Sequence, residues 1–273
     1  AYPGSVSQIR YCGGVLADFA PQTCCPVFLV GHVTKTGDLA GPKLLEHMVD
    51  TVLYFEGTGG GAIRMIRAVK NRFGTTGELA VLVMQRDGLL PVDQASVHFL
   101  SGRRGIEPGS VVCTVKNGSR IFLIEVQALV SPTSFGTPRR MSLGIDPHRT
   151  NLLLAVLEMR VGLELLGDDV FVSIVGGLDV DEPAADLGVA AAVASSFRGR
   201  PLSPHTVLFG EVGLGGELRG AGQAPLRIRE ASQMGFNRCI LPARNVPDDT
   251  DPGIRLVGVS TLEEALDALF EDV

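Results

Sequence analysis

Short apolar runs that end at glycine or at a polar residue recur along this chain and constrain its fold most. Residues Pro26–Val30 (PVFLV) form such a run before Gly31, and residues 51–56 form a second. Continuous apolar runs of this length are typical of strands buried on both faces of a parallel sheet. Amphipathic stretches separate the runs, so the pattern predicts an α/β fold.

Composition supports a packed core. The 273 residues are 45% hydrophobic and 20% charged, but only 5% are aromatic and Trp is absent, so aliphatic side chains must build the core. No run of 18 apolar residues occurs and the first residues do not resemble a signal peptide, so neither a membrane segment nor secretion is expected. Five cysteines without C-x-x-C spacing indicate reduced thiols and a cytoplasmic protein: Cys12, Cys24, Cys25, Cys113 and Cys239.

Residues 63–70 and 78–84 have the pattern of two strands joined by a glycine-containing turn, which predicts a β-hairpin. Its tip carries Lys70 and Arg72 and would project two cations. Helices are predicted over 5–19 and 43–49. Residues 101–110 (SGRRGIEPGS) lack an apolar period and form the best domain boundary, which gives domains 1–105 and 111–273.

Beyond the boundary, strands are predicted over 111–115, 121–130, 170–175, 206–211 and 238–241, and helices over 149–163, 184–197, 226–234 and 262–270. The net charge is −6, but residues 111–160 carry six basic side chains (Lys116, Arg120, Arg139, Arg140, Arg149, Arg160) against three acidic ones (Glu125, Asp146, Glu158). An anionic partner is therefore expected to meet the second domain through this segment.

The chain contains no G-x-x-x-x-G-K-[ST] motif, so it has no phosphate-binding loop of its own. Residues 57–61 (GTGGG) lead into a strand rather than a helix, so a plain turn is expected there.

The pentapeptide Lys70-Asn71-Arg72-Phe73-Gly74 resembles the KNRFG motif of the bacterial RadA (Sms) family of DNA recombination and repair ATPases. The stretches GHVTKTGDLAGPKLLEHMVDTVLYFEG, IEVQALVSPTSFGTPRR and LFGEVGLGGELR agree with the family as well. RadA proteins contain a four-Cys zinc finger, a RecA-like ATPase domain and a domain similar to the Lon protease. The resemblance implies the end of the RecA-like sheet followed by a Lon-like domain of the ribosomal protein S5 domain 2 type.

In such a protein ATP and Mg²⁺ would bind in the ATPase part and zinc in the N-terminal finger; none is expected to bind this chain alone. The hairpin also resembles the K-x-R element of DnaB-type ring helicases, which implies that Lys70 and Arg72 act in trans on a neighbour's nucleotide. His32 resembles the γ-phosphate sensor of RecA-like ATPases. The alternatives are a solvated surface hairpin and an ordinary loop histidine.

Lon proteases use a Ser-Lys dyad. At the matching position Asp181-Glu182-Pro183 is followed by Ala184, and no lysine follows Lys116. The position of the lysine falls near Pro225, so peptidase activity is not expected. Arg139, Arg140, Arg149 and Arg160 are the candidate DNA contacts, with ordinary surface charge as the alternative. The stretch GAGQAPLRIRE departs from the family pattern, so the resemblance assigns no role to Arg227 or Arg229.

The resemblance implies part of a DNA-dependent ATPase that drives branch migration in homologous recombination and repair. Its expected partners are single-stranded and duplex DNA without sequence preference, further copies in a hexameric ring, and a recombinase of the RecA type. The alternative is a structural hexamerisation module without DNA contact.

Overall fold

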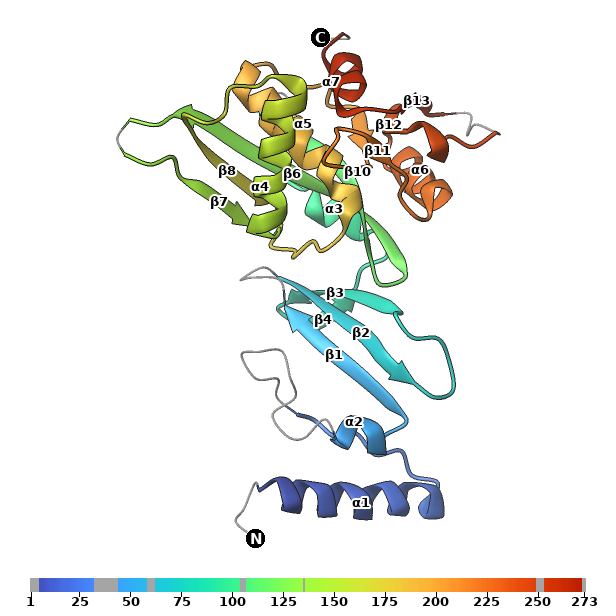
Figure 1. Ribbon diagram of the computed structural model, residues 1–273. Helices are drawn as coiled ribbons and strands as arrows, with labels where there is room; N and C mark the ends of the chain where they lie inside the picture. The colour runs from blue at the N-terminus through green and yellow to red at the C-terminus, as the bar shows by residue number, and fades with distance from the viewer. Residues whose placement is uncertain are drawn as a thin grey trace. The chain divides into compact units, whose positions relative to one another are not determined.

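The computed structural model describes residues 5–31, 44–57, 62–103, 107–134, 136–248 and 253–271. Contacts divide the chain into two compact units (Figure 1). The first comprises Ala1–Glu56 with Met65–Ala80, and the second Gly57–Arg64 with Val81–Val273.

The first unit begins with helix α1 (Val6–Thr23), whose N-terminus is capped by the Ser5 hydroxyl. Helix α2 (Leu44–Met48) packs on α1 at a glycine: a Cβ atom on Gly13 would lie only 2.6 Å from Leu45 Cδ2. Strands β1 (Thr51–Gly57) and β2 (Ile63–Asn71) follow.

Strands β3 (Leu79–Gln85) and β4 (Gly88–Pro91) complete a four-stranded sheet of order β1-β2-β3-β4. The predicted hairpin is present, since Ala68 N donates to Glu78 O and Gly77 N donates to Ala68 O. Helix α2 and strand β1 also lie where the sequence predicts them.

The predicted strand over residues 26–30 is wrong. These residues have no regular secondary structure, and the side chains of Phe28 and Val30 are 84% and 94% exposed. The reason is that an apolar run is buried as a strand only where strands pair with it on both sides. No described residue pairs with this segment.

The second unit is built around a seven-stranded sheet of order β13-β12-β9-β5-β6-β8-β7. Its strands are β5 (Ser110–Asn117), β6 (Arg120–Pro132), β7 (Arg140–Leu143), β8 (Asp168–Ile174), β9 (Thr206–Leu208), β12 (Arg238–Pro242) and β13 (Arg255–Val259). The β13-β12-β9-β5 strands and the β7-β8 pair are parallel, whereas β6 is antiparallel to both of its neighbours. The fold is therefore mixed α/β, as the sequence predicts.

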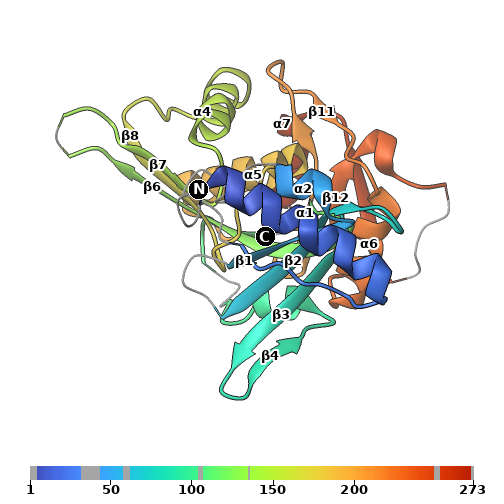
Figure 2. The same cartoon turned by 90° about the horizontal axis from the view of Figure 1, so that it is seen from below.

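Helices cover both faces of this sheet. Helices α4 (Pro147–Val156) and α5 (Asp186–Arg198) lie on one face, where α5 packs on β5 and β6 (Figures 1 and 2). Helix α6 (Ala224–Gln233) packs on the opposite face of β6, and helix α3 (Ala95–Phe99) also packs against β6. Helix α7 (Leu262–Glu271) packs beside β13 and α5.

The remaining elements are short. A π-helical turn, η1 (Leu157–Val161), continues α4 and ends at Gly162, whose φ is 76°. The 3-10 turns η2 (Pro183–Ala185) and η3 (Ala243–Asn245) precede α5 and follow β12. Strands β10 (Glu211–Val212) and β11 (Leu218–Arg219) form a small hairpin.

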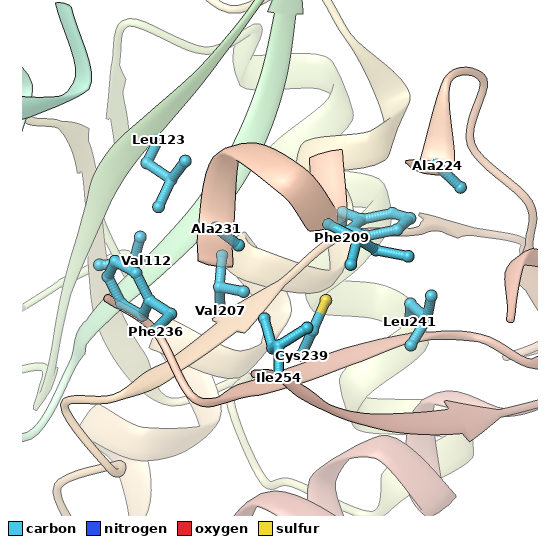
Figure 3. Packing of buried hydrophobic residues seen from close by; sticks show 11 residues of the cluster. Val112, Leu123, Val207, Phe209, Ala224, Ala231, Phe236, Cys239, Leu241 and Ile254 are labelled. Atoms are coloured by element: carbon cyan, nitrogen blue, oxygen red, sulfur yellow. The ribbon is translucent and has the colours of Figure 1, made fainter. Parts of the chain in front are cut away.

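The core is largely aliphatic, as the absence of Trp requires. One cluster joins Val112 and Leu123 of the sheet to Ile228 of α6 and to Phe209, and Figure 3 shows most of this cluster. Alternation along β6 points Leu123 into this cluster and brings Val126 to the opposite face, near Gly188 of α5.

Helix α3 belongs to the second unit although the sequence places it before the predicted boundary at 105–111. The Phe99 ring meets Phe122 of β6 edge to face at 5.6 Å, and Ser96 Oγ accepts from Leu123 N at 3.0 Å. These contacts join residues 95–99 to the larger sheet. The limits of the two domains stay a prediction.

Candidate functional site

The hairpin residue Lys70 lies against the C-terminal end of α2. Its ammonium group donates to three backbone carbonyls, at 2.5 Å to Glu46 O, 2.8 Å to Val49 O and 3.3 Å to His47 O. The last carbonyls of a helix have no partner within the helix and carry its negative dipole end. Lys70 therefore caps α2 and is only partly exposed.

Arg72 is held more loosely. Its Nη1 lies 3.2 Å from Asp50 Oδ1, and the two side chains are 58% and 59% exposed. Exposed ion pairs of this kind contribute about 0–1 kcal/mol. A backbone bond from Arg72 N to Asp50 O, at 3.0 Å, holds the main chain beneath the guanidinium. Arg72 can thus leave its partner at little cost.

The other residues of the pentapeptide shape the turn. Asn71 Oδ1 accepts from Phe73 N at 3.2 Å, which closes a local turn. Gly74 leaves room for this arrangement, because a Cβ there would lie 2.7 Å from Asn71 Nδ2. The Phe73 ring is 85% exposed. His32, the predicted phosphate sensor, lies outside the described residues.

In the second unit, Arg139 is bonded to Asp169 of β8. Its backbone N donates to Asp169 Oδ1 at 2.8 Å, and its Nε and Nη2 donate to Oδ2 at 2.9 and 2.5 Å. These bonds, with one from the Thr133 hydroxyl, lower the pKa of Asp169 to about 2. The Arg139 guanidinium also lies over the Phe171 ring at 5.6 Å, although the side chain remains 70% exposed.

Arg139 and Arg140 do not form one cluster, because successive side chains along a strand alternate between faces. Ser142, two residues after Arg140, bonds the Thr150 hydroxyl of α4, so Arg140 belongs to the α4 face and Arg139 to the other. Arg140 and Arg160 are exposed, and neither side chain has a hydrogen bond or ion pair with any residue that the structure describes.

Arg149 is committed to a buried carboxylate. Its Nε donates to Asp186 Oδ1 at 2.9 Å and its Nη2 contacts Oδ2, which also accepts from Val212 N at 3.0 Å. The Asp186 side chain is 1% exposed. Burial raises the pKa of Asp186, while the bonds from Arg149 and Val212 oppose that rise. The guanidinium of Arg149 therefore has a structural partner.

Ala184, which the sequence predicts to stand at the position of the Lon nucleophile, is buried. Asp186 lies two residues after it, and Glu182 lies two residues before it. Glu182 accepts from the Lys116 amide and from Nη2 of Arg227, a side chain with no exposed surface. Arg227 also donates to Thr114 O at 3.0 Å and to Gly222 O at 2.9 Å, and lies over the Phe209 ring at 5.5 Å.

The hydroxyl groups of Ser195 and Ser196 in α5 are bonded to backbone groups. The Ser195 hydroxyl donates to Arg200 O at 2.6 Å and accepts from Gly109 N, so it serves the backbone. Ser196 likewise accepts from Val130 N. The buried Cys113 thiol lies beside Gly188 of α5, and burial raises its pKa to about 12, which keeps it protonated at neutral pH.

Comparison with known proteins finds relatives over nearly the whole chain. The chain is 50% identical over 265 residues to the protein named DNA repair protein RadA of Bacillus subtilis, covering 97% of this chain. The chain is a RadA homologue. Proteins of the same name from Pseudomonas aeruginosa and Chlamydia pneumoniae are 49% and 48% identical over 98% of it. No family model matches the chain.

The chain spans 58% to 60% of the length of these RadA relatives. In the part of the chain that the structure describes, no helix is both long and apolar enough to cross a membrane.

The RadA resemblance assigns roles to the cations but none to their carboxylate partners. Asp50, Asp169 and Asp186 each bind one of the candidate arginines. Asp50 lies within a stretch that agrees with the family, yet the resemblance gave it no role. Arg227 carries one sequence signal, the departure from the family pattern, and it proves to be the largest fully buried side chain.

Proposed function

We propose that this chain belongs to a DNA-dependent ATPase that drives branch migration in homologous recombination and DNA repair. In this proposal residues 111–273 form a Lon-like domain that serves as ring scaffold and DNA-binding surface, and residues 1–105 complete a RecA-like ATPase domain. The observation that carries the proposal is the sequence identity of 49–50% to RadA proteins, which extends over both parts of the chain.

The hairpin supports the ATPase part of the proposal. Arg72 stands on a turn that Asn71 and Gly74 shape, and it is exposed with one weak partner. A guanidinium in that situation can reach a phosphate of a bound nucleotide in a neighbouring copy, where it would offset the charge that develops during phosphoryl transfer. ATP and Mg²⁺ would bind outside this chain.

Unpaired arginines support the DNA surface. Arg140 and Arg160 are exposed and uncommitted, and Arg139 is exposed although paired with Asp169. Arg149, in contrast, is only 31% exposed and serves Asp186. We therefore expect Arg140 and Arg160 to contribute most of the DNA affinity within the predicted set of four.

Duplex and single-stranded DNA binding by this chain at several salt concentrations tests the proposal. Each neutralised phosphate adds about −0.9 to the slope of log K against log salt for duplex DNA. Replacing Arg140 and Arg160 by Ala should therefore make that slope about two units less steep.

A matched control replaces Arg229 and Arg255, which are also exposed but lie outside residues 111–160. The control should leave the slope unchanged. If both double variants bind like the wild-type chain, Arg140 and Arg160 do not contact DNA. The structural alternative, a hexamerisation module, then becomes the better account, and sedimentation should show hexamers of the chain that form without DNA.

A further inference from the structure

We propose that Lys70 is a positioning residue that anchors the hairpin to α2, and that Arg72 alone of the two cations reaches the neighbouring copy. This inference rests on the proposed function for the role of Arg72. The anchoring of Lys70 rests on contacts within this chain.

Three carbonyl acceptors distinguish Lys70 from Arg72. An ammonium group has three N–H donors, and the three carbonyls of residues 46, 47 and 49 satisfy all of them. To contact a phosphate, Lys70 would have to leave all three acceptors and expose the last carbonyls of α2. Charge-assisted hydrogen bonds are the strong ones, so this release is costly.

The chain segment that Lys70 binds, residues 46–49, leads directly into Asp50, the partner of Arg72. Residues 46–51 run along the hairpin, and Arg72 N donates to Asp50 O there. Thr51 Oγ1 lies 3.5 Å from Asn71 Oδ1. Helix α2 is fixed in turn to β1, because Tyr54 Oη donates to Glu46 Oε1 at 3.1 Å. Lys70 thus connects the hairpin to a supported segment, which sets where the Arg72 main chain stands.

Arg72 has the opposite properties. Among the residues that the structure describes, its guanidinium has one side-chain partner, Asp50, and both groups are exposed. The carboxylate can orient the guanidinium at rest and release it to a stronger anion such as a phosphate group. In the K-x-R pair, Lys70 therefore holds the hairpin in place, whereas the Arg72 side chain is free to bind a phosphate of the neighbouring copy.

Amide hydrogen exchange in this chain tests the anchor. Lys70→Met keeps the aliphatic stem but removes the donors, and Arg72→Met is the matched control on the same turn. The reporters are the Val49 and Arg72 amides, which bond Leu45 O and Asp50 O. Lys70→Met should speed exchange at both amides about tenfold or more, because local opening loses three charge-assisted bonds.

Arg72→Met should change exchange at Val49 less than about twofold, as expected for loss of an exposed pair. The Phe209 amide, bonded to Ile240 O in the second unit, reports whether the rest of the chain stays folded. Exchange at Val49 and Arg72 that Lys70→Met leaves unchanged would overturn the anchor.

A double-variant cycle in the full-length ATPase tests the division of roles. Arg72→Met should lower kcat by about 10³, as loss of an arginine finger does. If Lys70 acts only through the hairpin, Lys70→Met added to Arg72→Met should lower kcat no further than about twofold. A further tenfold loss would mean that Lys70 touches the reacting phosphate and would overturn the inference.

The two proposals fail in different ways. If Arg72→Met leaves kcat unchanged, the trans-acting role of the hairpin is wrong, and the claim that Arg72 reaches the neighbour is wrong with it. The anchoring of Lys70 is then judged on amide exchange alone.

Discussion

At the scale of single residues, two carboxylates that flank Ala184 in sequence are each paired with an arginine. Glu182 binds Arg227 and Asp186 binds Arg149. Each carboxylate also accepts from a backbone amide, which makes the pairs part of the chain's folding rather than of its chemistry.

The Arg227 pair should therefore matter for stability. Arg227→Ala leaves Glu182 without its buried partner, and loss of one member of a buried pair costs about 3–5 kcal/mol. Glu182 is 19% exposed, so we expect the lower end of that range. Urea unfolding measures the change. Arg229→Ala on the same helix should stay within about 0.5 kcal/mol, because Arg229 is exposed. Equal losses in both variants would contradict this account.

Asp169 should give the chain a measurable acid dependence. Its pKa is about 2 in the folded chain and about 4 in an unfolded one. A carboxyl with a lowered folded pKa contributes stability that is complete above about pH 4 and is lost as the pH falls towards about 2. The difference in unfolding midpoint between the wild-type chain and Asp169→Asn should shrink over that interval.

The cause can be tested at Arg139, the main source of the lowered pKa. Arg139→Met should move the acid loss towards ordinary carboxyl values. A difference between wild type and Asp169→Asn that does not change from pH 6 to pH 2 would contradict the assignment.

At the scale of elements, glycines with positive φ fix two helix boundaries in different ways. Gly144 joins β7 to α4 and Gly162 ends η1, and both have φ of 76°. A Cβ on Gly144 would lie 2.5 Å from Leu178 O and 2.8 Å from Ile174 Cβ, whereas a Cβ on Gly162 would meet nothing within 4 Å.

Alanine substitutions at Gly144 and Gly162 distinguish the cost of backbone strain from the cost of steric crowding. Gly162→Ala should cost about 1–2 kcal/mol, the penalty of a left-handed conformation for a residue with a Cβ. Gly144→Ala should cost about 1–3 kcal/mol more, because the added methyl group also overpacks the turn. Chemical denaturation of the two variants gives the comparison, and indistinguishable losses would mean that the turn at Gly144 opens freely.

Most elements of both units follow from local pattern, and the exceptions have tertiary causes. The hairpin strands, β5, β6, α5 and α7 lie close to their predicted positions. The edge strands β7 and β13 and helix α3 were not predicted, because each is short and stabilised by neighbours distant in sequence. Residues 26–30 show the opposite error, an apolar run without a partner strand.

The candidate site could be predicted only as a set of residue types. Sequence motifs identify Lys70 and Arg72, but the three carbonyls that hold Lys70 are backbone atoms, which carry no sequence signal. Similarly, Arg139 and Arg140 are adjacent in sequence. Their side chains lie on opposite faces of the sheet only because a strand begins at Arg140.

At the scale of the whole molecule, this chain should not bind nucleotide by itself. Its sequence contains no G-x-x-x-x-G-K-[ST] loop to surround the phosphates. Titration of a fluorescent ATP analogue should give no saturable signal at micromolar chain, whereas a RadA protein of full length serves as the positive control. Saturable micromolar binding would contradict the proposal that ATP binds outside this chain.

The π-helical turn at Leu157–Val161 has a consequence for how sequences of this kind can change in length. A π-turn bonds each residue to the fifth one along, so it holds one residue more than an α-turn. Deletion of a single residue there can convert the wide turn into an ordinary one without rotating α4, which Asp146 caps at the other end. We therefore expect that a chain of this kind can lose one residue at this point and keep the packing of α4 on the sheet.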